Sequence, residues 1–233
     1  MNEKTIREQK LLSCTALNKE QQLELQLIKL KNTKSNCEYH SSIDDAIKKI
    51  FLDMQPYSMY SYDQLLDMGY TVDEIVKKTV SLSEDAITNY STDKNEASYW
   101  LDHRANSPSL FKCAMYAGII LGHFSVTPVL VAEAEEFMRG ERTEIQFTIV
   151  SKVDILTTKH CLYISSVVVH KLFRNTLMST KLIRQGYRLI KYHLATNSNA
   201  CGYFAEAYSP QGRKLCELFG MKNVNGNMYS KKI

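Results

Sequence analysis

The sequence predicts a mixed α/β domain in which helices lie on both sides of a partly antiparallel sheet. Two observations carry this prediction. Strand candidates at 110–116 and 118–126 meet at Ala117-Gly118, a pair that is typical of a tight hairpin. A strong apolar strand at 161–169 is then followed by the clearest helical pattern, 177–194, whose apolar positions recur at helical spacing. Short strands and helices therefore alternate along the second half of the chain.

The chain of 233 residues is long enough for one domain with an appendage. Residues 1–35 contain no Gly or Pro and are rich in Lys, Gln and Glu, which indicates an N-terminal extension that is either strand or helix. The domain is predicted to span residues 36–233. It begins with a short strand at 37–40 and a helix capped by Ser42.

The remaining elements follow from periodicity and from turn residues. Helices are predicted at 61–68, 71–89, 129–139 and 210–219, and a strand at 202–207. Residues 90–109 read as a polar loop, and 144–156 as either a strand or a loose insertion. Asn225-Gly226 predicts a hairpin turn within the final segment, 223–231.

The cysteine pattern predicts free thiols and a reducing compartment, so we expect a cytoplasmic protein. No two of the six cysteines form a CxxC pair, and none has zinc-ligand spacing to a histidine, so no metal is expected. The first 30 residues lack the apolar stretch of a secretory signal. No apolar run approaches the roughly 18 residues that a membrane span requires.

The net charge of +4 is unevenly distributed. Residues 160–233 carry a charge of +9, whereas residues 1–159 carry −5. A basic half favours a polyanionic ligand, and a solvated basic surface is the alternative. Nucleic acid is not the expected ligand, because the chain has no recognisable DNA-reading motif.

The junction between the strand at 161–169 and the long helix predicts an anion-binding site. Helix N-termini present backbone N–H groups without intrahelical partners, and the helix dipole favours negative charge there. The junction reads Arg174-Asn-Thr-Leu-Met-Ser179, in which an arginine and hydroxyl groups add further donors.

This junction and the segment Glu206-Ala-Tyr-Ser-Pro-Gln-Gly-Arg-Lys-Leu-Cys-Glu-Leu-Phe-Gly-Met221 resemble the GNAT superfamily of N-acetyltransferases. Members carry an Arg/Gln-x-x-Gly-x-Gly/Ala loop that binds the coenzyme A pyrophosphate, followed by a Glu-Ala-Ser-Pro-x-Gly-like segment. Tyr39-His-Ser-Ser-Ile-Asp-Asp-Ala46 is similar to the family's opening strand and helix. The resemblance spans roughly residues 36–233, and the last 70 residues carry its motifs. It implies a mostly antiparallel sheet flanked by helices.

Two positions depart from the family pattern. Leu177 replaces the first glycine of the loop and Ser179 the second, so a leucine side chain could crowd the pyrophosphate. Cys216 stands where many members have the tyrosine that protonates the leaving thiolate. A thiol can donate a proton, but a buried structural cysteine is the alternative, and Tyr208 could supply the hydroxyl instead.

The resemblance implies acyl transfer from acetyl-CoA or another acyl-CoA, used as co-substrate, to a primary amine in a ternary complex. Backbone groups near Ser166, Val167 and Val169 would hold the pantetheine arm and polarise the thioester carbonyl. Glu206 is the candidate base for the amine, and Tyr208 or Cys216 the candidate acid. The alternative for Glu206 is a solvated strand position. The expected phosphate ligands are Arg174, Asn175, Thr176, Leu177, Met178, Ser179 and Thr180.

Two alternatives remain open. The basic residues Lys181, Arg184 and Arg188, with Lys191, form one stripe on the long helix, which could dock an acyl carrier protein or be a solvated face. The donor would then resemble that of GNAT-fold N-acyl amino acid synthases. A catalytically inactive GNAT-like binding module is the second alternative. The acceptor, a small molecule or a protein lysine, would lie over 57–100 and 128–159, where the acidic residues 133–136 suit a cation.

Overall fold

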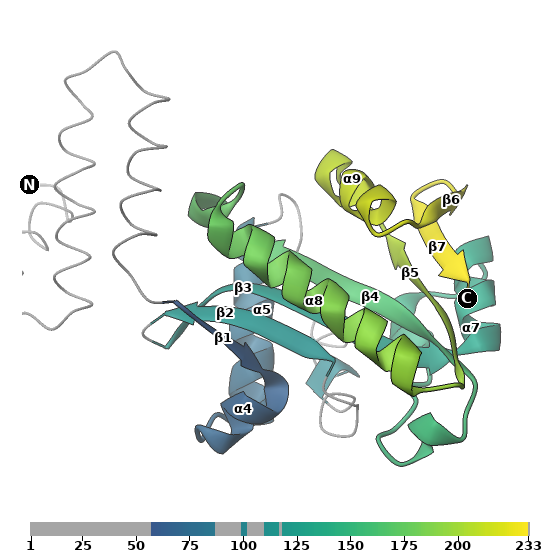
Figure 1. Ribbon diagram of the computed structural model, residues 1–233, viewed down its shortest axis with the longest axis horizontal. Helices are drawn as coiled ribbons and strands as arrows, with labels where there is room; N and C mark the ends of the chain where they lie inside the picture. Colours follow the sequence, from purple (N-terminus) through teal and green to yellow (C-terminus); the bar gives the residue numbers. More distant parts are fainter. Residues whose placement is uncertain (1–56, 87–98, 102–109, 117, 233) are drawn as a thin grey trace, which may run out of the picture. The chain divides into compact units, whose positions relative to one another are not determined.

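A seven-stranded sheet forms the centre of the domain (Figure 1). The computed structural model describes residues 57–86, 99–101, 110–116 and 118–232, which belong to a compact unit that begins at Tyr57. The predicted extension at 1–35, the strand at 37–40 and the helix that begins at Ser42 lie outside the described residues. The strands are β1 (Ser58–Ser61), β2 (Phe111–Tyr116), β3 (Ile119–Leu130), β4 (His160–Val169), β5 (Ala200–Glu206), β6 (Lys222–Asn225) and β7 (Met228–Lys232).

The strands lie in the order β1-β2-β3-β4-β5-β7-β6. All neighbours are antiparallel except β4 and β5, which are parallel. Parallel neighbours need a long crossover, and α8 (Leu177–Thr196) provides it. The expected mixed, mostly antiparallel sheet flanked by helices is therefore confirmed.

Helices cover both faces of this sheet. Besides α8, the described α-helices are α4 (Tyr62–Asp67), α5 (Val72–Ala86), α7 (Val131–Arg139) and α9 (Pro210–Leu218). Three short 3-10 helices are η1 (Glu144–Gln146), η2 (Asp154–Leu156) and η3 (Lys171–Phe173). Figure 1 shows α8 in front of the sheet and α5 behind it. Of the helices that the structure describes, none combines the length and apolar character that a bilayer crossing requires.

Three apolar clusters hold these layers together. The first joins α8 and α9 to one face of the sheet through residues such as Leu182, Ile190 and Phe219. The other two lie on the opposite face: one joins α4 and α5 to β2 and β3, and the other joins α7 to β4 and β5. Tyr163 and Leu162 belong to different clusters, because neighbouring strand residues point to opposite faces.

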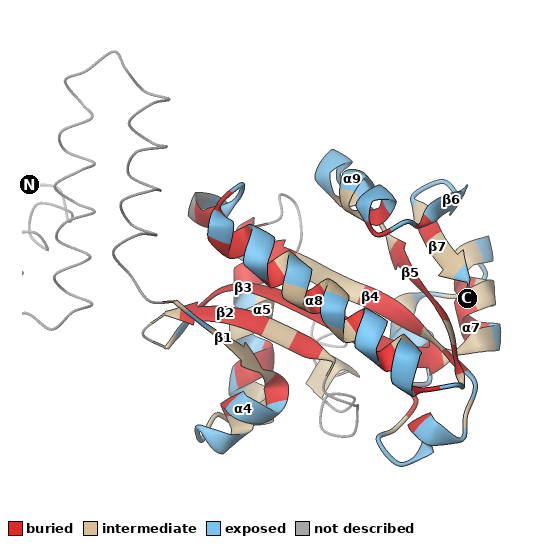
Figure 2. Ribbon diagram, viewed as in Figure 1, coloured by how far each residue is buried: buried red, intermediate tan, exposed pale blue. Residues whose placement is uncertain are grey.

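The helix boundaries follow from local sequence chemistry. Ser61 and Gln64 form a capping box at the start of α4. Ser209 caps α9, whose first residue is Pro210, and the chain leaves the helix through Gly220 at φ 73°. Figure 2 shows that α8 alternates buried and exposed residues along its length, as its apolar periodicity predicts.

Two segments differ from the sequence reading. Strand β1 was not predicted, because Ser58–Ser61 is four residues long and has no apolar alternation. Residues 144–156 form the loose insertion rather than a strand, with two short 3-10 helices and one isolated bridge from Ile149 to Val129. Of the predicted loop 90–109, residues 99–101 are helical, and the rest lies outside the described part.

Candidate active site

The parallel strands β4 and β5 separate part of the way along the sheet. Their register ends at Tyr163 and Phe204, although β4 continues to Val169 and β5 to Glu206. The backbone of the second half of β4 is consequently not paired with β5. This is the separation that the family resemblance implies for the fourth and fifth strands.

A bulge in β4 lies just beyond the separation point. Ser166 faces Ser125 of β3 while Ile164 faces Val126, so Ser165 is the extra residue. The bulge reverses the alternation of side chains: Val167 packs with the α8 cluster, whereas Val168 packs with the α5 cluster. The predicted pantetheine-arm residues Ser166, Val167 and Val169 all lie half-buried on this stretch.

The loop after β4 delivers the chain to the N-terminus of α8. Asn175 adopts a left-handed conformation at φ 60°, which asparagine tolerates better than most residues. Thr176 caps the helix: its Oγ1 accepts from the Ser179 N–H at 3.4 Å, while the Thr176 N–H donates to Ser179 Oγ at 3.1 Å. The hydroxyls of Thr176 and Ser179 are buried in this box and are therefore directed inward.

The first two residues of α8 carry the amides that can meet an anion. By helix geometry, the N–H groups of Leu177 and Met178 have no intrahelical acceptor. The Leu177 side chain is 75% exposed, whereas that of Met178 is fully buried. Thr180 is exposed, but its hydroxyl donates to the Thr176 carbonyl at 3.1 Å. The backbone of this turn, more than its side chains, therefore fits a phosphate.

Arg174 links this loop to α5. Its Nε donates to the Val169 carbonyl at 3.3 Å, and its Nη2 donates to the carbonyl of Ala86, the last residue of α5. The guanidinium therefore joins the end of β4 to the end of α5. Its remaining N–H groups could still meet a phosphate, because Arg174 lies at the surface.

The candidate acid–base residues lie in two environments, Glu206 and Tyr208 near the surface and Cys216 in the core. Glu206 is half-buried at the end of β5, and its Oε2 accepts from the hydroxyl of Tyr208 at 2.6 Å. Tyr208 is 74% exposed. Cys216 lies in the core between α9 and the sheet, where burial raises the pKa of its thiol to about 11. The structure brings Glu206 and Tyr208 together and places Cys216 apart from them.

Tyr163 lies close to the Glu206–Tyr208 pair. Its hydroxyl donates to Oε2 of Glu144 at 2.8 Å. Burial raises the pKa of Tyr163 well above its usual value, and the nearby Glu144, Tyr208 and Glu206 raise it further. Groups from β4, β5 and the insertion therefore meet at the separation point of the strands.

A cavity of about 70 Å³ lies on the α5 side of the sheet. It combines apolar side chains with His123 of β3, Ser166 of β4 and Glu144 of η1. His123 is 3% exposed and stacks on Phe111, with ring centroids 6.1 Å apart. His123 and Glu144 are not among the site residues predicted from the sequence, although both regions predicted for the acceptor contribute to this lining.

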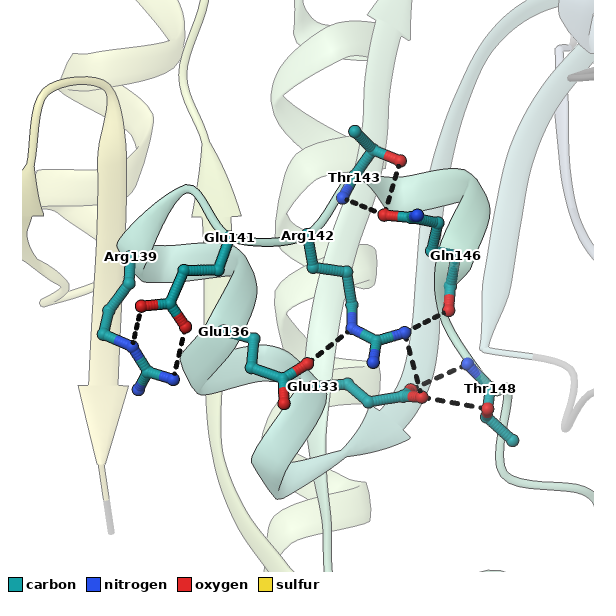
Figure 3. A network of polar contacts seen from close by, with 8 residues as sticks. All are labelled: Glu133, Glu136, Arg139, Glu141, Arg142, Thr143, Gln146 and Thr148. Atoms are coloured by element: carbon teal, nitrogen blue, oxygen red, sulfur yellow. Dashed lines mark hydrogen bonds and ion pairs between the residues drawn. The ribbon is translucent and has the colours of Figure 1, made fainter.

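The acidic residues of α7 hold the insertion in place (Figure 3). Glu133 is 8% exposed and accepts from the Thr148 N–H at 2.7 Å and hydroxyl at 2.9 Å. Arg142 lies 3.3 Å from Glu133 and 2.8 Å from Glu136. These carboxylates already have partners within the chain, so their contacts favour a structural role over binding of a cationic acceptor.

Two further predicted features can be located. Lys181, Arg184, Arg188 and Lys191 are all exposed on α8, so the basic stripe is a surface feature. Among the residues that the structure describes, no group of three or more His, Cys, Asp and Glu side chains could hold a metal ion. The four described cysteines, Cys113, Cys161, Cys201 and Cys216, are free.

Comparison with known proteins gives matches in structure. The sequence matches no protein-family model and no curated protein. The fold is similar to Arabidopsis thaliana NAA60 in complex with acetyl-CoA, with a TM-score of 0.50 and 13% identity, over 76% of this chain and all of that one. It is also similar to a GNAT family acetyltransferase from Brucella melitensis in complex with acetyl-CoA (TM-score 0.46, 17% identity, 77% of this chain and 89% of that one).

The strand order, the parallel β4–β5 pair and this similarity together define the architecture. The domain has the fold of the GNAT superfamily of N-acetyltransferases. The family resemblance of the sequence is thereby confirmed at the level of fold.

Proposed function

We propose that this protein is an acyltransferase that moves an acyl group from an acyl-CoA to a primary amine by direct attack. The observation that carries the proposal is the separation of β4 from β5 beside the N-terminus of α8. The cleft offers unpaired strand backbone to a thioester, and the helix start offers amides to a phosphate.

The loop residues predicted for the donor take different parts in this proposal. The amides of Leu177 and Met178 would meet the pyrophosphate, and Asn175, Thr176 and Ser179 would hold the turn in shape. Arg174 would act at the edge of the same site, with part of its guanidinium committed to the Ala86 carbonyl. Thr180 lies one turn further on and would serve as a peripheral ligand.

Proton transfer requires an acceptor for the amine proton and a donor for the sulfur. Tyr208 is the proposed donor, because its hydroxyl is at the surface and is held by Glu206 at 2.6 Å. The raised pKa and burial of Cys216 favour Tyr208 over the thiol. Glu206 remains the candidate for the base.

The first test is calorimetric titration of the full chain with acetyl-CoA and with a longer acyl-CoA. Micromolar binding is expected, and Leu177→Glu should weaken it by placing an anion beside the helix amides. Leu218→Glu is the matched control, since Leu218 is equally exposed on α9. Absence of binding to both donors would contradict the proposal.

An acyl carrier protein is the second candidate donor. The exposed Leu177 and the exposed basic stripe Lys181, Arg184, Arg188 and Lys191 favour it, since a carrier presents an acidic surface and no adenosine phosphates. Salt-dependent binding of an acyl carrier protein without binding of acyl-CoA would select this donor. A chain that binds a thioester but transfers no acyl group would instead be an inactive binding module.

A further inference from the structure

The cavity between α5 and the sheet is lined by a buried histidine that the predicted mechanism does not use. His123 lies on β3, with Ser83 of α5 near one ring nitrogen and Ser166 of the β4 bulge near the other. We propose that His123 accepts the proton of the acceptor amine through Ser166, and that the cavity beside it receives a slender aminoalkyl group. This inference rests on the proposed acyl transfer.

The hydrogen bonds of Ser83 determine which nitrogen of His123 carries the proton. Ser83 Oγ donates its single hydrogen to the Thr79 carbonyl at 2.9 Å. The same oxygen lies 3.4 Å from His123 Nε2 and can therefore only accept a hydrogen bond from that nitrogen. The geometry assigns the hydrogen to Nε2, and Nδ1 is left with its lone pair.

That lone pair points towards the candidate active site. His123 Nδ1 lies 3.3 Å from Ser166 Oγ, so the serine hydroxyl can donate to it. Ser166 is three residues beyond Tyr163, where the pairing of β4 with β5 ends. A proton taken up at Ser166 can thus pass to His123 from the strand that lines the separated cleft. Such bonds are often long before substrate binds and shorten in the complex.

The lining of the cavity indicates which amine it accepts. Ile75, Val76 and Val80 of α5 form an apolar wall, with Trp100 and Phe111 beside them. A volume of about 70 Å³ is far below the roughly 300 Å³ or more of a typical ligand pocket, so it admits the end of a chain rather than a branched group. An unbranched aminoalkyl group, from a small amine or a lysine side chain, fits this description.

Glu144 provides the charge that a cationic amine requires. It lines the same cavity, and the Tyr163 hydroxyl holds its carboxylate at 2.8 Å. Besides His123, the ionisable side chains of the lining are Glu144 and Tyr62 of α4. The described groups that face the imidazole include Ser83 from α5, Phe111 from β2 and Ser166 from β4, with the thiol-bearing Cys113 of β2 and Val168 of β4 paired beside it in the sheet.

The reaction balances with these groups. An ammonium nitrogen loses two protons: one passes through Ser166 to His123 and leaves to water with the product, and the other goes to the departing sulfur. The nitrogen attacks the thioester carbonyl, the C–N bond forms, the C–S bond breaks, and its electron pair leaves on sulfur. The products are an amide and a free thiol.

The test measures thiol release from acetyl-CoA by the full chain across pH, with n-butylamine as acceptor. His123→Gln and His123→Asn should each lower kcat by about 100-fold or more and remove the acid limb of the kcat/KM profile. Ser166→Ala should lower kcat, and Ser83→Ala should shift the acid limb. Ser81→Ala, at an exposed position on the same helix, should change neither.

Binding of acetyl-CoA by calorimetry separates this inference from the proposed function. The His123 variants should bind acetyl-CoA as the unchanged chain does, which also shows that they fold. Variants that bind the donor and keep the original rate and pH profile would overturn the role of His123 alone. An unchanged chain that neither binds acetyl-CoA nor releases thiol would overturn the proposed function and this inference with it.

Acceptor choice tests the cavity. n-Butylamine and a lysine peptide with a blocked N-terminus should both be acylated, and their relative kcat/KM distinguishes the two sources of the aminoalkyl group. An alanine dipeptide presents its amine on a branched carbon and should be a poor acceptor. Preference for the dipeptide would overturn the aminoalkyl assignment.

Discussion

A buried pair of histidines at the far end of β4 should make the stability of the domain depend on pH. His160 begins β4 and His193 lies in the last turn of α8, with their Nε2 atoms 2.8 Å apart. His160 Nδ1 lies 2.8 Å from the Thr158 carbonyl and must donate to it, so its Nε2 accepts from His193. This arrangement requires a neutral His160, because a proton on His160 Nε2 would face the N–H of His193.

The pKa shifts give the sign and the size of the effect. Burial, and then the charge of His160, lower the pKa of His193 from 6.5 to about 4, and burial lowers that of His160. The unfolded chain therefore takes up protons first, so stability falls as pH drops below about 6.5 and levels off near 4. For His193 alone, linkage gives a loss of about 1 kcal/mol between pH 7 and pH 5.5, and about 3 kcal/mol in full.

Urea unfolding of the full chain at pH 7 and pH 5.5 measures this loss. His193→Gln is the appropriate variant, since its amide can still donate to His160 but cannot take up a proton in this range. The difference in unfolding free energy between the two pH values should be smaller in the variant by about 1 kcal/mol. An equal pH dependence in both proteins would refute the argument.

Three further predictions test the packing and the site. Gly186→Ala should destabilise the domain by about 1–3 kcal/mol in urea unfolding, because the added Cβ would lie 2.2 Å from Cγ of Phe124. Arg142→Ala should lower the thermal midpoint more than Arg139→Ala does, since Arg142 contacts the buried Glu133 whereas the ion pair of Arg139 is with the exposed Glu141. Cys216→Ala should leave thiol release unchanged, whereas Tyr208→Phe should lower it, and the reverse result would make the thiol the donor.

Much of the architecture is local and could be predicted from the sequence. The apolar spacing of Leu182 and Ile190 predicts the inward face of α8, and both residues are fully buried. Asn225-Gly226 predicts the final hairpin, which joins β6 to β7. The close contact of Gly186 with Phe124 could not be predicted, because it depends on how α8 crosses β3.

The site was harder to predict, because residue type does not tell where a side chain points. Thr176 and Ser179 were selected as donors, but their hydroxyls turn inward to cap α8. A signal for the cavity does exist in the sequence. His123, Ser125 and Thr127 occupy alternate positions in an otherwise apolar strand, which marks one polar line on a face that is buried.

The loop before α8 bears on which thioester the protein uses. In the described residues, Asn175 is the one non-glycine residue with a positive φ, so Leu177 and Ser179 need no glycine for their conformation. Glycine at these two positions would therefore not change the backbone conformation and would only leave more room for a phosphate. Ser179 takes little space at the start of α8, because its side chain is buried in the capping box. The exposed Leu177 is therefore the side chain that a pyrophosphate would have to pass. A carrier-borne thioester brings no pyrophosphate, so Leu177 would not obstruct it. If the unchanged chain does not bind acyl-CoA, Leu177 is the side chain that excludes it, and Leu177→Gly should then restore acyl-CoA binding.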